Sequence, residues 1–523
     1  MKKTPKIALI LSSIVCYCLL WVPYQFAFLS FVCFLPILFA LEQGLKENMP
    51  TKKLFLLLYL PLLAASFYLN FWISNAHWGG TLAAGIVQSL LLFLPFNLYY
   101  RYRLAGQHRQ GFLILVLSVV TFEYLQNFWD LSWPWFQLGN SLSAYPNLIQ
   151  FYSFGGVISG SLWLMMFQVF LFSILLNIKS LKSNYYILIL LIFPFFLSQD
   201  NQNTNSKNNS IDVYVYQPNL DAYRQKFSAD LGKEILKIHE VLEQMDSTKE
   251  SLLVCPETFI FKLINEESTA SDKFLNLLQK GITSEKHKVL LGANTFRFVN
   301  PKQEKDKSSL RRSGDNYYKV YNSAILMSKT RCLGIYNKNK LVVGAEQTPF
   351  SSVLTPFFQL FDFDLGGVSG NLGRAEEAKC LKSEHYKLSP IICFESAFSE
   401  YTANFSQLNT DFICVITNDD WWGNTSGHQQ HLELAKLRAI ENQKYVVRSA
   451  NTGISAVISP QGEVLQRLDY RTGGVIKASI KLDNSQTYFV KHNRLIGNLV
   501  TFVFVLVFLS VETLLFRTKK QNV

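Results

Sequence analysis

Long apolar runs fill the first part of this chain and return near its C-terminus. A membrane-spanning helix needs about 20 largely apolar residues, because its backbone must bond internally where water is absent. Such runs, some of them shorter than 20 residues, lie at 7–21, 24–41, 54–72, 83–100, 111–128, 156–177, 184–198 and 495–516. The first run resembles a signal peptide, but no small-residue cleavage site follows it. The sequence therefore predicts eight spans, seven before a long polar region and one after it.

The loop charges predict the orientation of these spans. Cytoplasmic loops are enriched in Lys and Arg. With the N-terminus inside, the inside loops 42–53, 101–110 and 178–183 carry these residues, as does the tail after residue 516. The outside loops 74–81 and 129–155 carry none. We therefore expect cytoplasmic termini and an outward-facing polar region. Much of the net charge of +12 flanks the spans, so we do not expect nucleic acid as a partner.

One predicted outside loop is rich in tryptophan. It has the sequence Trp129-Asp-Leu-Ser-Trp133-Pro-Trp135-Phe-Gln-Leu-Gly-Asn140. An aromatic belt at the headgroup level is the interpretation that residue types favour. A re-entrant or interfacial segment lining a lipid entrance is the alternative.

The polar region begins with an Asn-rich linker and then alternates short strands with longer helices. The linker, 199–210, has little to bury. Strands are predicted at 211–217, 251–256, 288–296, 321–328, 387–393, 411–417, 444–450 and 453–459, and helices at 225–246, 268–285 and 428–444. This alternation indicates an α/β domain with a buried sheet. The predicted domains are 1–198, 199–210, 211–490 and 491–523.

The polar region holds five of the eight cysteines of the chain. An odd number leaves at least one thiol unpaired within this region. Cys332 and Cys380 could form a disulfide, although the sequence does not decide this. Cys393 ends the apolar run Ser389-Pro-Ile-Ile-Cys393. A strand end presents a side chain well, yet a single strand-end cysteine is more often structural than catalytic.

Two further residues change that balance. Glu257 follows the strand at 251–256, and Lys338 follows the apolar stretch Ile335-Tyr336. A carboxylate can take a thiol proton as general base, and an ammonium can stabilise an oxyanion. Glu257, Lys338 and Cys393, in that order, form a plausible set for covalent acyl chemistry.

The order and context of these three residues resemble the carbon–nitrogen hydrolase, or nitrilase, superfamily with its Glu-Lys-Cys triad. The resemblance continues through Thr417-Asn-Asp-Asp-Trp421-Trp-Gly423 and Arg448-Ser-Ala-Asn-Thr-Gly453. With eight spans and the segments 133–141, 217–219 and 321–323, the chain resembles the apolipoprotein N-acyltransferase family. This implies a polytopic α-helical membrane domain of eight spans plus an α/β nitrilase-like αββα sandwich domain.

The resemblance also implies an activity. Cys393 would take an acyl chain from a phospholipid, phosphatidylethanolamine in the first place, and hold it as a thioester. The α-amino group of a diacylglyceryl-cysteine at a lipoprotein N-terminus would then accept the chain. The family further implies a monomer in the cell inner (cytoplasmic) membrane with a periplasmic catalytic domain and no cofactor.

Supporting roles are implied for residues around the triad. Glu346 matches the second glutamate of the family, although the loop 341–350 departs from the common pattern. Glu395 matches the glutamate two residues past the cysteine, with a capping or salt-bridge role as the equal alternative. Asn322 lies in a matching segment, and Trp421 either lines the pocket or packs. Phe394 replaces a common tyrosine and so lacks a hydroxyl.

Other polar residues are predicted to lie outside the chemistry. Lys340 lies two positions beyond Lys338 and is expected to be solvated. His428, His431 and Glu433 have helical spacing, but no zinc-like cluster accompanies them, and no metal is expected.

Two alternative functions remain open on the residues alone. One is a membrane-tethered amidase or nitrilase that hydrolyses a soluble substrate with a C–N bond. The other is a non-enzymatic scaffold or transporter with an inactive domain. Few charges lie within the predicted spans, which disfavours an ion-coupled transporter.

Overall fold

A computed structural model of the chain describes residues 5–21, 24–76, 78–176, 192, 194, 209–304, 306–350 and 371–521. It divides into two compact units. The helical unit consists of Met1–Ser74, Trp78–Asp200 and His492–Val523, and the α/β unit of Asn75–His77 and Asn201–Lys491.

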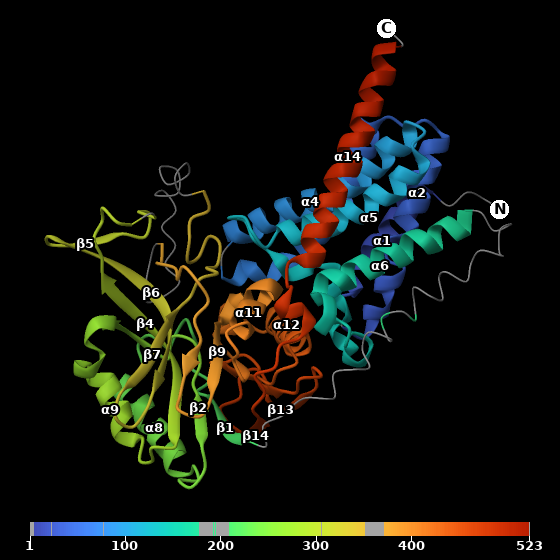
Figure 1. The fold of residues 1–523 in the computed structure, drawn as a ribbon. Coiled ribbons are helices and arrows are strands. Elements are labelled where there is room, and N and C mark those ends of the chain that lie inside the picture. Colours follow the sequence, from blue (N-terminus) through green and yellow to red (C-terminus); the bar gives the residue numbers. More distant parts are fainter. Residues whose placement is uncertain are drawn as a thin grey trace. The chain divides into compact units, whose positions relative to one another are not determined.

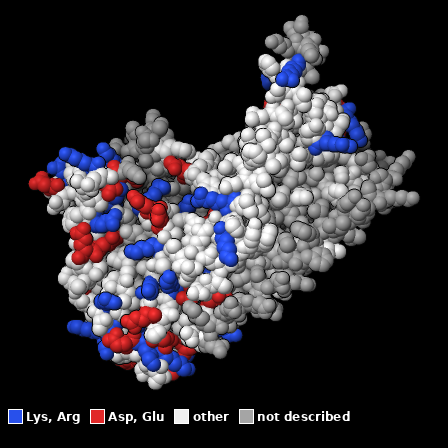
Figure 2. Space-filling view, viewed as in Figure 1, with Lys and Arg blue, Asp and Glu red and all other residues white. Residues whose placement is uncertain are grey.

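Apolar helices build the helical unit (Figure 1). They are α1 (Lys6–Leu19), α2 (Leu35–Lys46), α3 (Thr51–Asn70), α4 (Trp78–Leu104), α5 (His108–Leu125), α6 (Tyr152–Leu176) and α14 (Leu495–Gln521). Exposed leucines and phenylalanines lie along α3, α4 and α14, as expected for helices whose outer faces meet lipid. In Figure 2, charged side chains gather on the α/β unit and are sparse on the visible helical unit.

Five helical stretches among the described residues are long and apolar enough to cross a membrane. They are Tyr24–Lys46, Thr51–Asn75, Trp78–Leu104, Tyr152–Leu176 and Leu495–Arg517. α1 is apolar but has only 14 residues, and α5 is not among the five. The predicted run 184–198 and most of the linker 199–210 lie outside the described residues. The total of eight spans therefore stays a prediction.

The tryptophan-rich loop folds into short 3₁₀ turns, η3 (Pro134–Phe136) and η4 (Leu138–Ala144). Trp135 is buried and lies against Trp72 and Trp133, with ring centroids 5.3 Å away in each case. Asn140 Nδ2 donates to the carbonyls of Pro134 and Trp135 at 3.0 and 3.1 Å. Trp135 therefore packs inside the unit against other aromatic rings, and the aromatic-belt interpretation of the loop stays a prediction.

Two β-sheets form the centre of the α/β unit. The first has the order β14-β1-β2-β4-β6-β5, with β3 on β4 and β7 on β6, and the second has the order β13-β12-β11-β10-β9-β8. The strands of the first sheet are β1 (Ser210–Gln217), β2 (Ser251–Val254), β3 (Ile260–Asn265), β4 (His287–Phe298), β5 (Arg311–Ser313), β6 (Asn316–Met327), β7 (Cys332–Asn337) and β14 (Gly474–Lys481). Those of the second are β8 (Leu381–Lys382), β9 (Lys387–Ile392), β10 (Phe412–Thr417), β11 (Val446–Ala450), β12 (Ser455–Ile458) and β13 (Val464–Leu468).

The sheets pack on each other and carry helices on their outer faces. β1 contacts β11, and β6 contacts β9. α8 (Leu231–Glu243) and α9 (Lys273–Gly281) share an apolar core with the first sheet, while α11 (Ser399–Ser406) and α12 (Ser426–Asn442) pack on the second. The short α13 (Tyr488–Lys491) ends the unit. Figure 1 shows these helix pairs on opposite sides of the sheets, which is the predicted αββα arrangement.

Two parallel sets of strands decide where the site forms. β1, β2 and β4 run parallel in one sheet, and β9, β10 and β11 in the other. Each of the eight predicted strand ranges contains a strand, because buried apolar runs of this length mark sheet strands. The partly exposed strands β3, β5, β7, β8, β13 and β14 were not predicted. Cys332 and Cys380 carry free thiols.

Candidate active site

Glu257 and Lys338 meet in the buried interior of the α/β unit. Glu257 lies three residues beyond β2, and Lys338 directly follows β7. The Lys338 Nζ atom lies 3.2 Å from Glu257 Oε1, and the two side chains are 1% and 7% exposed. Main-chain pairing fixes the lysine, because its N–H donates to the carbonyl of Asn322 in β6 at 2.8 Å.

Glu346 and Asn322 complete this polar cluster. Lys338 Nζ donates to Glu346 Oε1 at 2.9 Å. Asn322 Nδ2 donates to Glu257 Oε1 at 2.7 Å and to Glu346 Oε1 at 3.1 Å. The Val342 N–H also donates to Glu346 Oε2 at 2.8 Å. The structure thus places Glu346 beside Lys338 despite the unusual loop sequence around it.

Cys393 follows β9 directly and turns the chain into η8 (Cys393–Ala397). Its φ of 51° lies in the left-handed region, which non-glycine residues rarely adopt. Such strain at one residue is typical of functional sites, where the surroundings force an unusual backbone. The carbonyl oxygen of Cys393 accepts a hydrogen bond from Ser396 Oγ at 2.8 Å and lies 3.1 Å from His431 Nε2.

The charges of Glu257 and Lys338 act on the pKa of the Cys393 thiol and on that of each other. Burial, reinforced by the charge of Glu257, raises the pKa of the Cys393 thiol, while Lys338 acts in the opposite direction. Burial alone would raise the pKa of Glu257, but Lys338, Asn322 and Lys226 outweigh it and hold the pKa low. Burial alone would lower the pKa of Lys338, but Glu346 and Glu257 hold it high. A low pKa of Glu257 and a high pKa of Cys393 together favour an ionised carboxylate and a protonated thiol at neutral pH.

Comparisons with known proteins identify the family of the chain. A family model described as carbon–nitrogen hydrolase matches residues 215–488. A second model, the apolipoprotein N-acyltransferase N-terminal domain, matches residues 13–170. The apolipoprotein N-acyltransferase of Chlorobaculum tepidum is 23% identical over 90% of this chain and 89% of its own length. That of Borreliella burgdorferi is 24% identical over 94% and 91%.

The chain belongs to the apolipoprotein N-acyltransferase branch of the carbon–nitrogen hydrolase family. Among solved structures, Nit3 of Saccharomyces cerevisiae, of the nitrilase superfamily, aligns with a TM-score of 0.36 and 18% identity, covering 55% of this chain and 93% of Nit3.

Within this family member, Glu395 joins the ends of β7 and β9. Its Oε1 atom accepts from the Tyr336 hydroxyl at 2.6 Å and from the Asn339 N–H at 2.7 Å. Its Oε2 atom accepts from the Ile392 N–H at 2.8 Å. These bonds hold the residues that flank Lys338 and Cys393. Of the two interpretations from sequence, the structure favours the capping role.

Phe394 and Trp421 make aromatic contacts with neighbouring rings. Phe394 is buried and meets Phe398 edge-on, with centroids 5.1 Å apart. Trp421 stacks on Phe227 at 6.3 Å and meets Tyr223 edge-on at 5.1 Å. Trp421 therefore packs against the segment that follows β1.

Lys340 is not simply solvated, and this prediction was wrong. Its Nζ atom lies 4.9 Å from the centroid of the Phe398 ring and 5.7 Å from that of Tyr401. The alternation of side chains along a strand does not apply, because β7 ends at Asn337 and Lys340 belongs to the loop beyond it.

The histidines of α12 belong to packing networks. His431 Nδ1 lies 2.9 Å from Asp419 Oδ1, and His431 Nε2 lies 2.7 Å from Ser396 Oγ. The His428 ring stacks on Tyr470 with centroids 4.4 Å apart. Glu433 pairs with Lys436 at 2.7 Å. Among the described residues, no group of three or more His, Cys, Asp or Glu side chains could hold a metal ion.

Sequence reasoning missed Lys226, which the structure places against Glu257. Its Nζ atom donates to the main-chain carbonyl of Glu257 at 2.9 Å. The available signal was its position beside Phe227 in the segment after Gln217. A single lysine in a polar segment is normally exposed, so residue type alone pointed the other way.

Proposed function

We propose that this chain transfers a fatty acyl chain from a phospholipid to the α-amino group of the N-terminal diacylglyceryl-cysteine of lipoproteins. Relatives named apolipoprotein N-acyltransferase along nearly the whole chain support this function. The observation that carries the mechanism is the ion-paired cluster of Glu257, Lys338 and Glu346, in which the charges of Glu257 and Lys338 act on the pKa of the Cys393 thiol.

In the first step, Glu257 takes the proton of the Cys393 thiol while sulfur attacks the ester carbonyl carbon of the phospholipid. Lys338 stabilises the negative charge that develops on the carbonyl oxygen. When the tetrahedral intermediate collapses, the C–O ester bond breaks. The lysophospholipid oxygen leaves with the proton held by Glu257, and the acyl chain stays on Cys393 as a thioester.

In the second step, the neutral α-amino group of the acceptor attacks the thioester carbonyl. Glu257 removes a proton from the attacking nitrogen, and the C–S bond breaks as the amide forms. The sulfur regains the proton from Glu257, so the enzyme returns to its starting state. Limiting water at the site favours this aminolysis over hydrolysis.

The donor, the membrane arrangement and the oligomeric state belong to the same proposal. Phosphatidylethanolamine is the proposed donor, and the protein acts as a monomer. The proposed domains are 1–198 with seven spans, 199–210, the catalytic domain 211–490, and 491–523 with the eighth span. The proposed topology, with cytoplasmic termini and a periplasmic catalytic domain at the inner membrane, is supported by the loop charges. Two membrane-anchored substrates then meet at a high effective concentration.

Mass spectrometry of the Cys393 peptide tests the mechanism. Purified protein incubated with phosphatidylethanolamine is expected to gain one acyl mass on Cys393, removable by neutral hydroxylamine. Addition of a diacylated lipopeptide should discharge it and acylate the peptide amine. Release of ammonia from small amides without any acyl-Cys393 would instead identify an amidase. Full function of Cys393→Ser in cells would exclude cysteine chemistry. Labelling of single cysteines in the loops with a membrane-impermeant reagent tests the topology.

A further inference from the structure

Lys226 lies in the segment between β1 and α8, yet its side chain is only 3% exposed. Its neighbours Arg224 and Gln225 are exposed. Hydrogen bonds hold the segment at several points: the Ala222 N–H donates to Asp420 Oδ2 at 2.6 Å, and the Asn219 N–H donates to the Asn451 carbonyl at 2.9 Å. The lysine is therefore held inside the protein by a fixed backbone.

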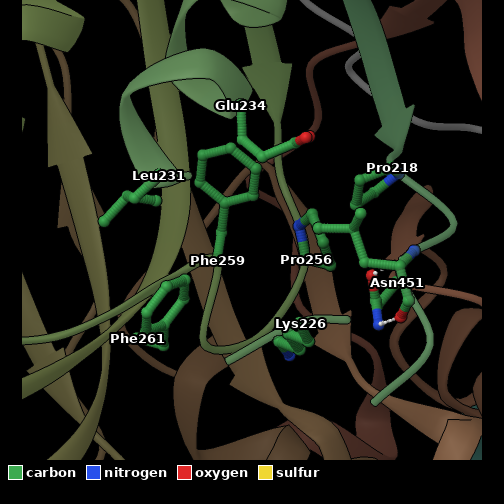
Figure 3. Close-up of a pocket in the computed structure, with 9 residues that line it drawn as sticks. Pro218, Lys226, Leu231, Glu234, Pro256, Phe259, Phe261 and Asn451 are labelled. Atoms are coloured by element: carbon green, nitrogen blue, oxygen red, sulfur yellow. Dashed lines mark hydrogen bonds between the residues drawn. The ribbon is translucent and has the colours of Figure 1, made fainter. Parts of the chain in front are cut away.

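The ammonium of Lys226 contacts the main chain of Glu257. Nζ donates to the main-chain carbonyl of Glu257 at 2.9 Å. With the amide oxygen of Asn418 turned toward it, Nζ also donates there at 3.2 Å. Figure 3 shows Lys226, Pro256 and Asn451 among the residues that line a small pocket.

Charges surround Glu257 from several elements. The groups that act on it or on its direct partners are Lys338 after β7, Lys226 after β1, Glu346 in the loop beyond Lys338, Cys393 after β9, and Asp419 and Asp420 after β10. Burial lowers the pKa of Lys226 to about 8, against the opposing charges of Glu257, Asp420 and Cys393. The amine is thus mostly protonated at pH 7, and in return its charge lowers the pKa of Glu257.

A purely structural role would not need a charge at this position. Burying an ammonium is costly, and an apolar side chain of similar length fills such space well. Two carboxylates, the buried Glu257 and the partly buried Glu346, share the ammonium of Lys338. A second cation next to Glu257 balances that excess of negative charge.

We propose that Lys226 is a positioning residue of this site, which fixes the main chain of Glu257 and supplies a second positive charge that keeps its carboxylate ready to accept the Cys393 proton. This inference rests on the proposed function in one respect, the assignment of Glu257 as the base.

The charge can be separated from the packing by three substitutions. Lys226→Met removes the charge and the donors, Lys226→Gln keeps a donor without charge, and Lys226→Arg keeps the charge. Lys233→Met, on the exposed first turn of α8, is the matched control. The measurement is the single-turnover rate of acyl-Cys393 formation from phosphatidylethanolamine between pH 3 and 9.5, a range chosen to include the ionisation of Glu257, whose pKa is held low. The rate of Cys393 alkylation by iodoacetamide, resolved by peptide mapping, is measured over the same range without lipid.

In both neutral variants the acid limb of the acylation profile is expected to move upward by about one pH unit, because loss of a nearby cation raises the pKa of Glu257. Alkylation at a given pH is expected to slow about tenfold, because the same loss raises the pKa of Cys393 and lowers its thiolate fraction. Lys226→Arg and Lys233→Met should keep the wild-type limb. If both neutral variants have lower maximal acylation rates but an unmoved acid limb, the proposal is overturned, and Lys226 has only a structural role. If Lys226→Met does not fold, Lys226→Gln against Lys226→Arg gives the same decision.

The two measurements also separate this inference from the proposed function. Wild-type protein that forms no acyl-Cys393 would refute the acyl transfer. The alkylation profiles would still show whether the charge of Lys226 acts on the site.

Discussion

Replacement of Lys338 by methionine tests how the buried charges depend on one another. The ammonium lies 3.2 Å from Glu257 and 2.9 Å from Glu346, and it is almost fully buried. Without it, two carboxylates share a buried site and cannot both stay ionised. One of them is therefore expected to bind a proton in the folded variant.

The free energy needed to keep that carboxyl protonated sets the expected loss of unfolding free energy in Lys338→Met. A glutamate with an unfolded pKa of about 4.3 needs about 1.36 kcal/mol per pH unit to stay protonated above that value. Lys338→Met should therefore lose about 4 kcal/mol of unfolding free energy at pH 7 and about 1 kcal/mol at pH 5. The loss is larger at pH 7 because the carboxyl that binds the proton has a higher pKa in the folded variant than in the unfolded chain. A group of this kind makes the folded state less stable as the pH rises. In the wild type, the lowered pKa of Glu257 works in the opposite direction.

The assay is denaturant unfolding of detergent-solubilised protein at both pH values, together with acyl-Cys393 formation. We expect the rate to fall about 10³-fold or more, since both the oxyanion partner and the ionised base are lost. Lys340→Met is the control. It should lose about 0.5–1 kcal/mol of unfolding free energy with its ring contacts, and it should keep the wild-type acylation rate. Equal stability loss at pH 5 and pH 7, or an acylation rate near that of the wild type, would refute the reasoning.

Three further outcomes are expected. Cys393→Ala should abolish the acyl mass shift, whereas Cys414→Ala, in the core of β10, should keep it; an acylated Cys393→Ala protein would contradict the assignment. Asn322→Leu removes donors at 2.7 and 3.1 Å from two carboxylates and should slow single-turnover acylation about 10- to 100-fold; a rate within about twofold of wild type would count against it. Burial raises the pKa of Glu395 to about 7, so its charge costs stability as pH rises above about 4.3. Relative to wild type, Glu395→Gln should therefore gain stability between pH 5 and 8, and a constant difference in unfolding midpoint would contradict this.

Strand positions and the order of the site residues could be predicted because each depends on a local pattern. Buried strands appear as short apolar runs, and the residues after them lie at a sheet edge. The strands β2 and β9 were found in this way, together with Glu257 and Cys393 beyond them. The partly exposed strands β7 and β14 have weaker patterns, so they were missed.

The partners of individual side chains could not be predicted in the same way. Lys340 and Lys226 are both lysines in short loops, where residue type predicts exposure. One lies over aromatic rings and the other is buried against Glu257. Trp135 likewise has a residue type suited to a membrane interface, but Trp72, distant in the sequence, covers it.

The sequence by itself determined that apolar helices accompany an α/β domain, and which three residues are candidates for covalent acyl chemistry. These features depend on composition and on periodicity within single elements. Only the tertiary structure decided that Glu346, Asn322 and Lys226 join Glu257 and Lys338, and that Glu395 holds the strand ends beneath them. These contacts depend on which strands become neighbours, and sheet order arises from packing between segments far apart in the chain.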